Sequence, residues 1–330
     1  MRTINSEQLH TPVELQMGEQ LRFGELDVTT TELCIELSDE HRQQMSDAIQ
    51  AGLLHFNGET DIPEETLAQK ITGLPTMLAR IDCSIVDGTV QPFEIEERPN
   101  GIGITTALGG SALQLNQLVR QHFMTLIGEV PQVIAPTERI GRIDDTFTDV
   151  TVLEARHQTQ RAVLLRTEPS QVTDEHDNLV SQSVSTARSE GSKGYRERTG
   201  HARRVSSIDQ LGDEADSMVV KGLQCSKAQH IDIVLSSEDR ATFGKKGTVT
   251  RSRALRNAQE AIDRDGAVIV ERFIPPISAR LGDMHGNMIL RVFAAVSSAD
   301  DIRVLGGVHV TRPELVVHGA RNALHGLVLV

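Results

Sequence analysis

The stretch that decides the fold is Met77-Leu-Ala-Arg-Ile-Asp-Cys-Ser-Ile-Val-Asp-Gly-Thr-Val-Gln-Pro-Phe-Glu-Ile-Glu-Glu-Arg98. Apolar residues occupy alternate positions from Met77 to Ile85, which predicts a strand with one buried face. Asp87-Gly88 is a turn dipeptide, and residues 90–98 predict a second strand. The two runs therefore predict an antiparallel hairpin whose second face is polar.

Three carboxylates of this hairpin, Asp82, Glu94 and Glu96, are candidates for one shared site. A two-residue loop at 87–88 would pair Asp82 with Phe93 and place Glu94 on the opposite face. A three-residue loop would pair Asp82 with Glu94 and bring the carboxylates together. Such a cluster repels itself unless a hard cation binds, so this register predicts a magnesium site. A solvated acidic sheet face is the alternative.

Composition excludes several classes of protein. The 330 residues carry 46 acidic and 33 basic side chains, a net charge of −13, which disfavours nucleic acid and membrane surfaces as partners. With 8 Phe, 1 Tyr and no Trp, stacking platforms for single-stranded nucleic acid are not expected. Three scattered cysteines predict neither a disulfide framework nor a zinc site. Because no long apolar run occurs, we expect a cytoplasmic protein.

The rest of the chain mixes helix and strand patterns, which predicts an α/β (α+β) fold. Ser38 is the expected cap of a helix that buries Met45, Ile49 and Leu53. Ser252 is the expected start of a second helix. Further runs are typical of strands: 132–135, 150–153, 162–165, 218–221, 230–235, 267–270 and 288–296. The stretch 188–204 has six basic and two acidic residues, which favours a solvated loop and leaves a mobile anion-binding lid as the alternative.

Three segments carry a resemblance to a known family. Phe93-Glu-Ile-Glu-Glu-Arg-Pro-Asn-Gly-Ile-Gly103 resembles the metal-binding signature of the ATP-grasp superfamily, with Asp82, Glu94 and Glu96 at the ligand positions. Met218-Val-Val-Lys-Gly222 is similar to the strand whose lysine reaches the ATP phosphates. Residues 268–276 resemble the hinge strand that holds adenine.

The resemblance implies a set of nucleotide-binding residues in the last third of the chain: Lys221, Gly222, Ser226, Lys227, Glu271, Arg272, Phe273 and Ile274. For Lys227 an ordinary surface lysine is the favoured interpretation. Glu271 would accept a hydrogen bond from the adenine amino group or ribose, and a solvated glutamate at a strand end is the alternative.

Three arginines are also candidate site residues. Arg291 matches a phosphate-contacting arginine of the family, and a structural ion pair is the alternative. The resemblance implies that Arg98 orients Glu94 or binds an acyl phosphate, with a plain ion pair to Glu94 as the alternative. For Arg80 an ion pair is the favoured interpretation.

The order of the segments resembles circularly permuted members, such as eukaryotic-type glutathione synthetase and glutathionylspermidine synthetase. The acidic hairpin precedes the lysine strand, so residues 318–326 would lead toward the N-terminal strands in space. The implied fold has two α+β lobes around a nucleotide: residues 1–106 with the hairpin, an inserted acceptor domain with a mobile basic loop at 107–200, and a nucleotide-binding lobe at 201–330. Two departures from the family are Glu96 in place of asparagine and a phosphate loop with Gly222 alone.

The resemblance implies an ATP-dependent carboxylate–amine ligase that works through an acyl phosphate. ATP and one or two Mg²⁺, with Mn²⁺ as a substitute, are the expected cofactors. An amino acid or short peptide is the expected substrate class, and a homodimer is one option. The alternatives are an ATP-binding regulatory module without turnover and a phosphotransferase on the same fold.

Overall fold

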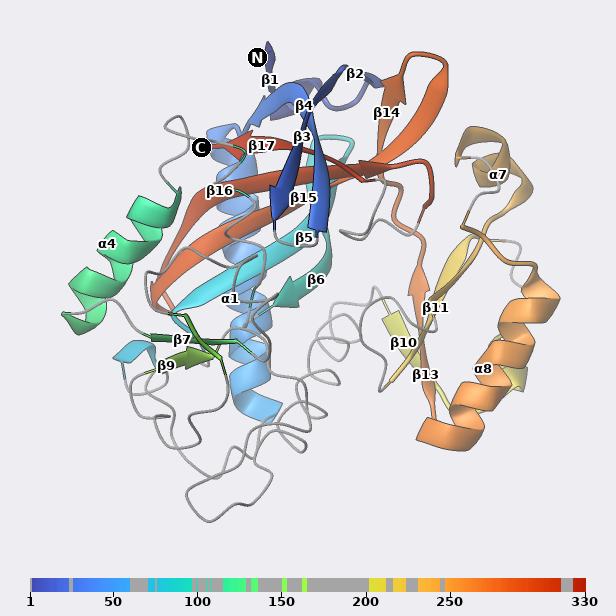
Figure 1. Cartoon of the computed structure of the whole chain (residues 1–330). Helices are drawn as coiled ribbons and strands as arrows, with labels where there is room; N and C mark the ends of the chain where they lie inside the picture. The colour runs from blue at the N-terminus through green and yellow to red at the C-terminus, as the bar shows by residue number, and fades with distance from the viewer. Residues whose placement is uncertain are drawn as a thin grey trace.

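The structure is a computed structural model of the whole chain (Figure 1). It describes residues 2–23, 26–59, 71–74, 76–96, 99, 105, 108, 115–128, 132–135, 150–152, 162–164, 202–211, 216–223, 231–243, 247–315 and 323–330. Within these residues strands dominate and form three sheets, accompanied by helices, which confirms the predicted α+β class. No helix among them is long and apolar enough to cross a membrane.

The largest sheet draws its ten strands from both ends of the described chain. Its members are β1 (Arg2–Asn5), β2 (Val13–Leu15), β3 (Met17–Phe23), β4 (Leu26–Glu36), β5 (Leu78–Val86), β6 (Thr89–Glu96), β14 (Ile277–Leu281), β15 (Met284–Ser298), β16 (Asp301–Arg312) and β17 (Leu324–Leu329). The main path runs β1-β4-β17-β16-β15-β14-β2, and β5 pairs with β15 and β6.

Strand β17 joins the C-terminal strands to the N-terminal ones. It lies between β16, to which it is antiparallel, and β4, to which it is parallel; Leu327 pairs with Val308 on one side and Cys34 on the other. Figure 1 shows the red β17 beside the blue β4. The approach of the C-terminal segment to the N-terminal strands is what the permuted order predicts.

Strands from the N-terminal part of the chain lie at both ends of the path through the large sheet. β14 pairs with β2 in parallel, and β3, which follows β2 directly in the chain, pairs with β4. The amide of Glu32 in β4 donates to the carbonyl of Gln16, between β2 and β3, at 3.4 Å.

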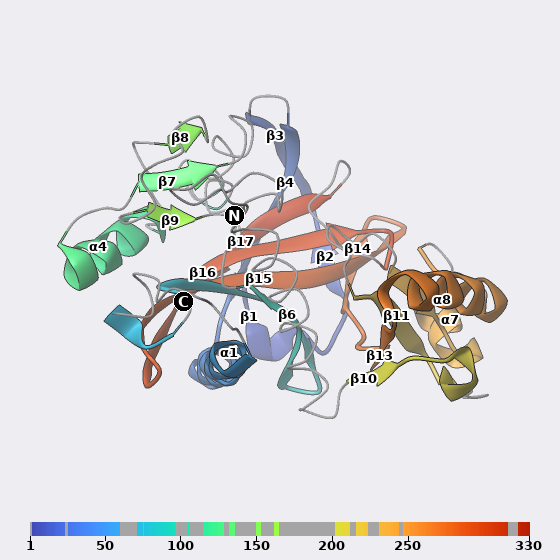
Figure 2. The ribbon, with the colours of Figure 1, turned by 90° about the horizontal axis from the view of Figure 1, so that it is seen from below.

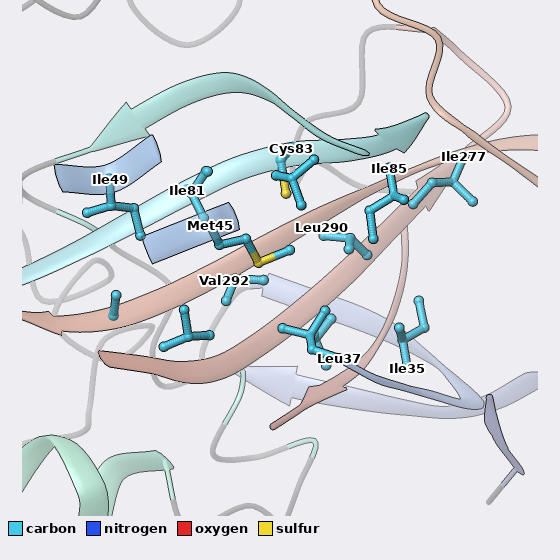
Figure 3. Close-up of a cluster of buried hydrophobic side chains, with 14 of the residues drawn as sticks. Ile35, Leu37, Met45, Ile49, Ile81, Cys83, Ile85, Ile277, Leu290 and Val292 are labelled. Atoms are coloured by element: carbon cyan, nitrogen blue, oxygen red, sulfur yellow. The ribbon is translucent and has the colours of Figure 1, made fainter. Parts of the chain in front are cut away.

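Helix α1 (Asp39–Glu59) covers one face of this sheet. The predicted stripe of Met45, Ile49 and Leu53 is buried there, which confirms the expected helix. The hydroxyl of Ser38 accepts from the amide of His41 at 3.3 Å, as expected of a cap. Figure 3 shows Met45 and Ile49 beside strand residues of the same core, among them Ile81, Leu290 and Val292.

Helix α4 (Leu115–Ile127) covers part of the opposite face. Its buried residues Leu115, Val119 and Phe123 pack with Phe293 and Ala295 of β15. Because side chains alternate along a strand, Arg291 lies on this same face, one step beyond Phe293. The face therefore changes from apolar to charged along β15, and the charged part is the candidate site.

A smaller sheet has the order β10-β13-β11-β12. Its elements are β10 (Ala202–Val205), η2 (Ile208–Leu211), β11 (Met218–Gly222), β12 (Ile231–Val234), α7 (Ser237–Phe243), α8 (Arg251–Asp265) and β13 (Val268–Arg272). Helix α8 packs on one face, and Figure 2 shows the whole unit to one side of the large sheet. The start expected at Ser252 is wrong, because Thr250 is the cap and its hydroxyl accepts from the amide of Arg253 at 3.3 Å.

A third, parallel sheet places β7 (Gln132–Ala135) between β8 (Val150–Val152) and β9 (Ala162–Leu164), where strands were predicted. Of the basic stretch, residues 188–201 lie outside the described residues, and Arg203 and Arg204 belong to β10. The boundaries at 106 and 200 stay a prediction. Hydrogen bonding divides residues 201–330 between the small sheet and strands β14–β17 of the large one.

Candidate functional site

The β5–β6 hairpin pairs Asp82 with Glu94, but its turn is shorter than this pairing was expected to require. Its turn has two residues, Asp87 and Gly88, both with positive φ (50° and 72°), so the three-residue loop is wrong. Nevertheless Asp82 pairs with Glu94, because the register shifts between Asp82 and Cys83 and Phe93 becomes an extra, bulged residue. Pro92 stands opposite Cys83 beside this bulge, a position that suits a residue without an amide hydrogen.

The bulge places Asp82, Glu94 and Glu96 on one face, together with Arg80. The Nε and Nη2 atoms of Arg80 donate to Oδ1 and Oδ2 of Asp82 at 2.7 and 3.1 Å. Nη2 also donates to Oε1 of Glu96 at 2.7 Å. Arg80 and Asp82 are buried, whereas the side chain of Glu96 is 27% exposed and Glu94 lies at the surface. Arg80 thus forms the expected ion pair, but with Asp82 and Glu96 as partners where Glu94 was expected.

Arg291 enters the same cluster from β15, where it pairs directly with Asp82. Its Nε lies 3.2 Å from Oδ2 of Asp82. The ion pair given as the alternative for Arg291 is therefore present, and the phosphate contact stays a prediction. Two guanidinium groups thus converge on one carboxylate, Arg80 by charge-assisted hydrogen bonds and Arg291 by an ion pair.

The cluster perturbs the protonation of its members. Burial raises the pKa of Glu96 to about 7; Glu94 and Asp82 add to the rise, and Arg80 opposes it. Burial works against the charge on Arg80, but Asp82 and Glu96 outweigh it and raise the pKa of the guanidinium. A carboxyl group with a raised pKa beside other carboxylates marks a place where added positive charge is favourable.

The expected magnesium set fits this geometry only in part. Both oxygens of Asp82 and one oxygen of Glu96 already accept from guanidinium groups. Across the described part of the chain, no three His, Cys, Asp or Glu side chains are grouped so as to hold a metal ion. Glu94 and the second oxygen of Glu96 have the chemistry that Mg²⁺ prefers, whereas Asp82 does not fit without loss of its ion pairs.

A second charged pair lies on the small sheet. Lys221 Nζ in β11 is 2.7 Å from Oε2 of Glu271 in β13, and the two side chains are 18% and 3% exposed. The strand register puts both on the face opposite α8, together with Val219 and Ile269. The solvated alternative for Glu271 is wrong, because this carboxylate is buried and neutralises Lys221.

The other predicted nucleotide-binding residues lie in different environments. Gly222 ends β11 and is buried, and Arg272 ends β13 and is exposed. Phe273 packs against Phe243 with ring centroids 5.6 Å apart, and its amide donates to the carbonyl of Ser217 at 3.3 Å. That hinge amide is thus engaged within the protein, and Ile274 is partly buried. Ser226, Lys227 and Arg98 lie outside the described residues.

One apolar contact links the two sheets near these charged pairs. Leu315, three residues after β16, packs with Ile233, Leu235 and Phe273 of the small-sheet unit. This contact brings the end of β13 that follows Glu271 against the segment that follows β16.

Sequence reasoning missed one residue on the charged face. His325 in β17 pairs with Val310, which pairs with Ile289, so alternation places it on the face of Arg291. Burial lowers its pKa to about 4, and Arg291 adds to that effect. Only the pairing of β17 with β16 reveals this position, because His325 and Arg291 lie on different strands.

The buried histidines should make stability depend on pH. His309 and His325 have folded pKa values of about 4 against an ordinary 6.5. As the pH falls through about 6.5 the unfolded chain takes up protons that the folded protein refuses, so stability falls until about pH 4, by at most roughly 3 kcal/mol per histidine. Urea unfolding at several pH values should show this slope. His309→Gln keeps a donor for the carbonyl of Leu33 and removes one titrating group, so the number of protons taken up on unfolding should fall by about one. An unchanged dependence of stability on pH would contradict the low pKa of His309.

No protein-family model matches the chain, and no curated protein matches it in sequence. Among solved structures, it is similar to a glutathione synthetase-like effector from Globodera pallida in apo form, at 10% identity over 88% of each chain with a TM-score of 0.42. It is also similar to a gamma-glutamylcysteine synthetase candidate from Methylobacillus flagellatus, at 10% identity over 85% of this chain and 82% of that one, with a TM-score of 0.38. At these scores the likeness carries no argument about activity.

Proposed function

We propose that the chain is an ATP-dependent carboxylate–amine ligase of the ATP-grasp type, which forms an amide through an acyl phosphate. The observation that supports this most directly is the bulged register, which places Glu94 beside Asp82 and Arg291 on one sheet face. A second support is Lys221, a cation paired with the buried Glu271 on the face of the small sheet opposite α8. Together these residues supply charges of both signs, which phosphoryl transfer requires.

In the proposed reaction a substrate carboxylate oxygen attacks the γ-phosphorus of ATP, and ADP leaves. An amine then attacks the acyl carbon, loses a proton, and releases inorganic phosphate. Lys221 and Arg291 bind and orient phosphate oxygens, and Arg98 holds the acyl phosphate. The proposed nucleotide residues are Lys221, Gly222, Ser226, Lys227, Glu271, Arg272, Phe273 and Ile274. Mg²⁺, when bound with ATP, neutralises phosphate charge, and Glu94 and Glu96 offer it carboxylate oxygens.

A second candidate function is an ATP-binding module without turnover. The closed ion pairs favour it, since Arg80 and Arg291 are engaged by Asp82, and Lys221 is engaged by Glu271. In an active ligase Lys221 has to turn from Glu271 toward phosphate, whereas a module that binds weakly does not require this change.

The test is a screen for ADP release with purified protein and Mg·ATP, over amino acids, short peptides and polyamines. The ligase requires both a carboxylate and an amine for sustained release, and Arg291→Met should abolish it. ATP binding without release would identify the module, and phosphate transfer to an acceptor without any amine would identify a phosphotransferase. Absence of any nucleotide binding would contradict all three.

A further inference from the structure

We infer that Asp82 is a positioning residue that anchors Arg80 and Arg291, and that it is not a metal ligand. The inference rests on the proposed function for the phosphate role of Arg291. It departs from the ligand set that the resemblance implies, in which Asp82 occupies a metal position.

The contacts of Asp82 carry the argument. Oδ1 accepts from Arg80 Nε at 2.7 Å, and Oδ2 accepts from Arg80 Nη2 at 3.1 Å and lies 3.2 Å from Arg291 Nε. Each oxygen thus has a guanidinium donor, and the two arginines reach it from its own strand and from β15. A Mg²⁺ ion binds carboxylate oxygen at about 2.0–2.1 Å and would repel both guanidinium groups at that distance.

Burial separates Asp82 from the other two carboxylates. β5 lies between β6 and β15, so Asp82 has a strand on each side, and its side chain is only 6% exposed. Glu94 is exposed and Glu96 is 27% exposed on the outer strand β6. Mg²⁺ dehydrates reluctantly and keeps several waters, so an ion that arrives from solvent meets Glu94 and Glu96 first.

The role that remains for Asp82 is geometric. The carboxylate fixes the direction in which the Arg80 guanidinium points, since the Nε–H of Arg80 is committed to Oδ1, and it holds Arg291 beside it by an ion pair. The arginine Nη groups that do not contact Asp82 are then oriented for another anion. On the proposed function, that anion is a phosphate group of ATP, and Asp82 acts on it through Arg291.

The first test compares three variants that each remove one negative charge: Asp82→Asn, Glu94→Gln and Glu96→Gln. Each variant loses the same charge, so a difference in Mn²⁺ affinity between them reports the loss of a metal ligand. Electron paramagnetic resonance follows the Mn²⁺ titration. We expect Glu94→Gln and Glu96→Gln to bind Mn²⁺ about tenfold more weakly than Asp82→Asn does. Equal or greater weakening in Asp82→Asn would overturn the inference.

The second test uses the wild-type protein, so it does not depend on whether Asp82→Asn folds. Hydrogen exchange of the ¹⁵N-labelled Nε–H group of Arg80, which donates to Asp82, should be slow and should stay slow when Mn²⁺ or Mn·ATP is added. Faster exchange on metal binding would mean that the metal displaces Arg80 from Asp82. If no metal or nucleotide binds, the proposed function fails, while fast exchange in the free protein would separately contradict the anchoring role.

Discussion

Lys221→Met is expected to abolish measurable ATP binding and to destabilise the protein at the same time. The ammonium group neutralises Glu271, whose side chain is 3% exposed, so its removal leaves a buried negative charge where phosphate should bind. Removal of one partner of a buried ion pair costs about 3–5 kcal/mol of folding stability, and ATP loses the cation that its phosphates require. Isothermal titration with ATP and urea unfolding measure the two losses.

The double variant Lys221→Met/Glu271→Gln separates the two effects. Glutamine is nearly the same shape as glutamate and carries no charge, so much of the stability should return. ATP binding should stay lost, because the cation is still absent. If ATP binds the double variant as well as it binds the wild type, Lys221 holds Glu271 for structural reasons alone and the phosphate role is wrong.

Arg80→Met is expected to give a large loss of stability. Arg80 is 3% exposed and joins Asp82 to Glu96, so its removal strips both carboxylates of their shared cation. Breaking a buried ion pair from one side costs about 3–5 kcal/mol, a large part of the roughly 5–15 kcal/mol that stabilises a typical domain. Urea or thermal unfolding should show a much lower midpoint.

Arg253→Met is the matched control, because Arg253 lies exposed on α8 and the same atoms are removed. Its effect should stay within about 0.5 kcal/mol. Arg80→Met/Glu96→Gln should recover part of the loss, since Asp82 then keeps Arg291 and Glu96 no longer carries a charge. Equal stability of Arg80→Met and Arg253→Met would show that the cluster contributes little to folding.

The spacing of apolar residues predicted the helices and strands that depend on near neighbours in the sequence. Alternation identified β5 and the polar face of Arg80, Asp82 and Ser84, and four-residue spacing identified the buried stripe of α1. These signals depend on near neighbours in sequence and on the two periodicities of regular structure. The same reasoning misplaced the start of α8, because both Thr250 and Ser252 have the hydroxyl that a cap requires.

The details of the site depend on contacts between distant segments. The sequence allowed two registers, and the pairing of Asp82 with Glu94 was expected only with a three-residue loop. The structure has the two-residue loop, and a bulge at Phe93 restores that pairing. The engagement of Asp82 by Arg291 joins residues more than 200 positions apart, which no spacing rule encodes. Likewise, Lys221 was identified by its strand, but its neutralisation by Glu271 needed the register of β11 with β13.

The position of β17 has a consequence for how the protein is made. β17 is synthesised after all the other described strands of the large sheet, yet it lies between β16 and β4 in the interior of that sheet. Until it has left the ribosome, β4 presents an open edge along the row that β17 will occupy, and open edges pair readily with other chains. The ten-stranded sheet must therefore form late, whereas the small sheet, built from residues 202–272 alone, has all of its strands earlier. Slow translation before β17 should thus prolong an aggregation-prone state in which Asp82 and Arg291 are not yet held in place.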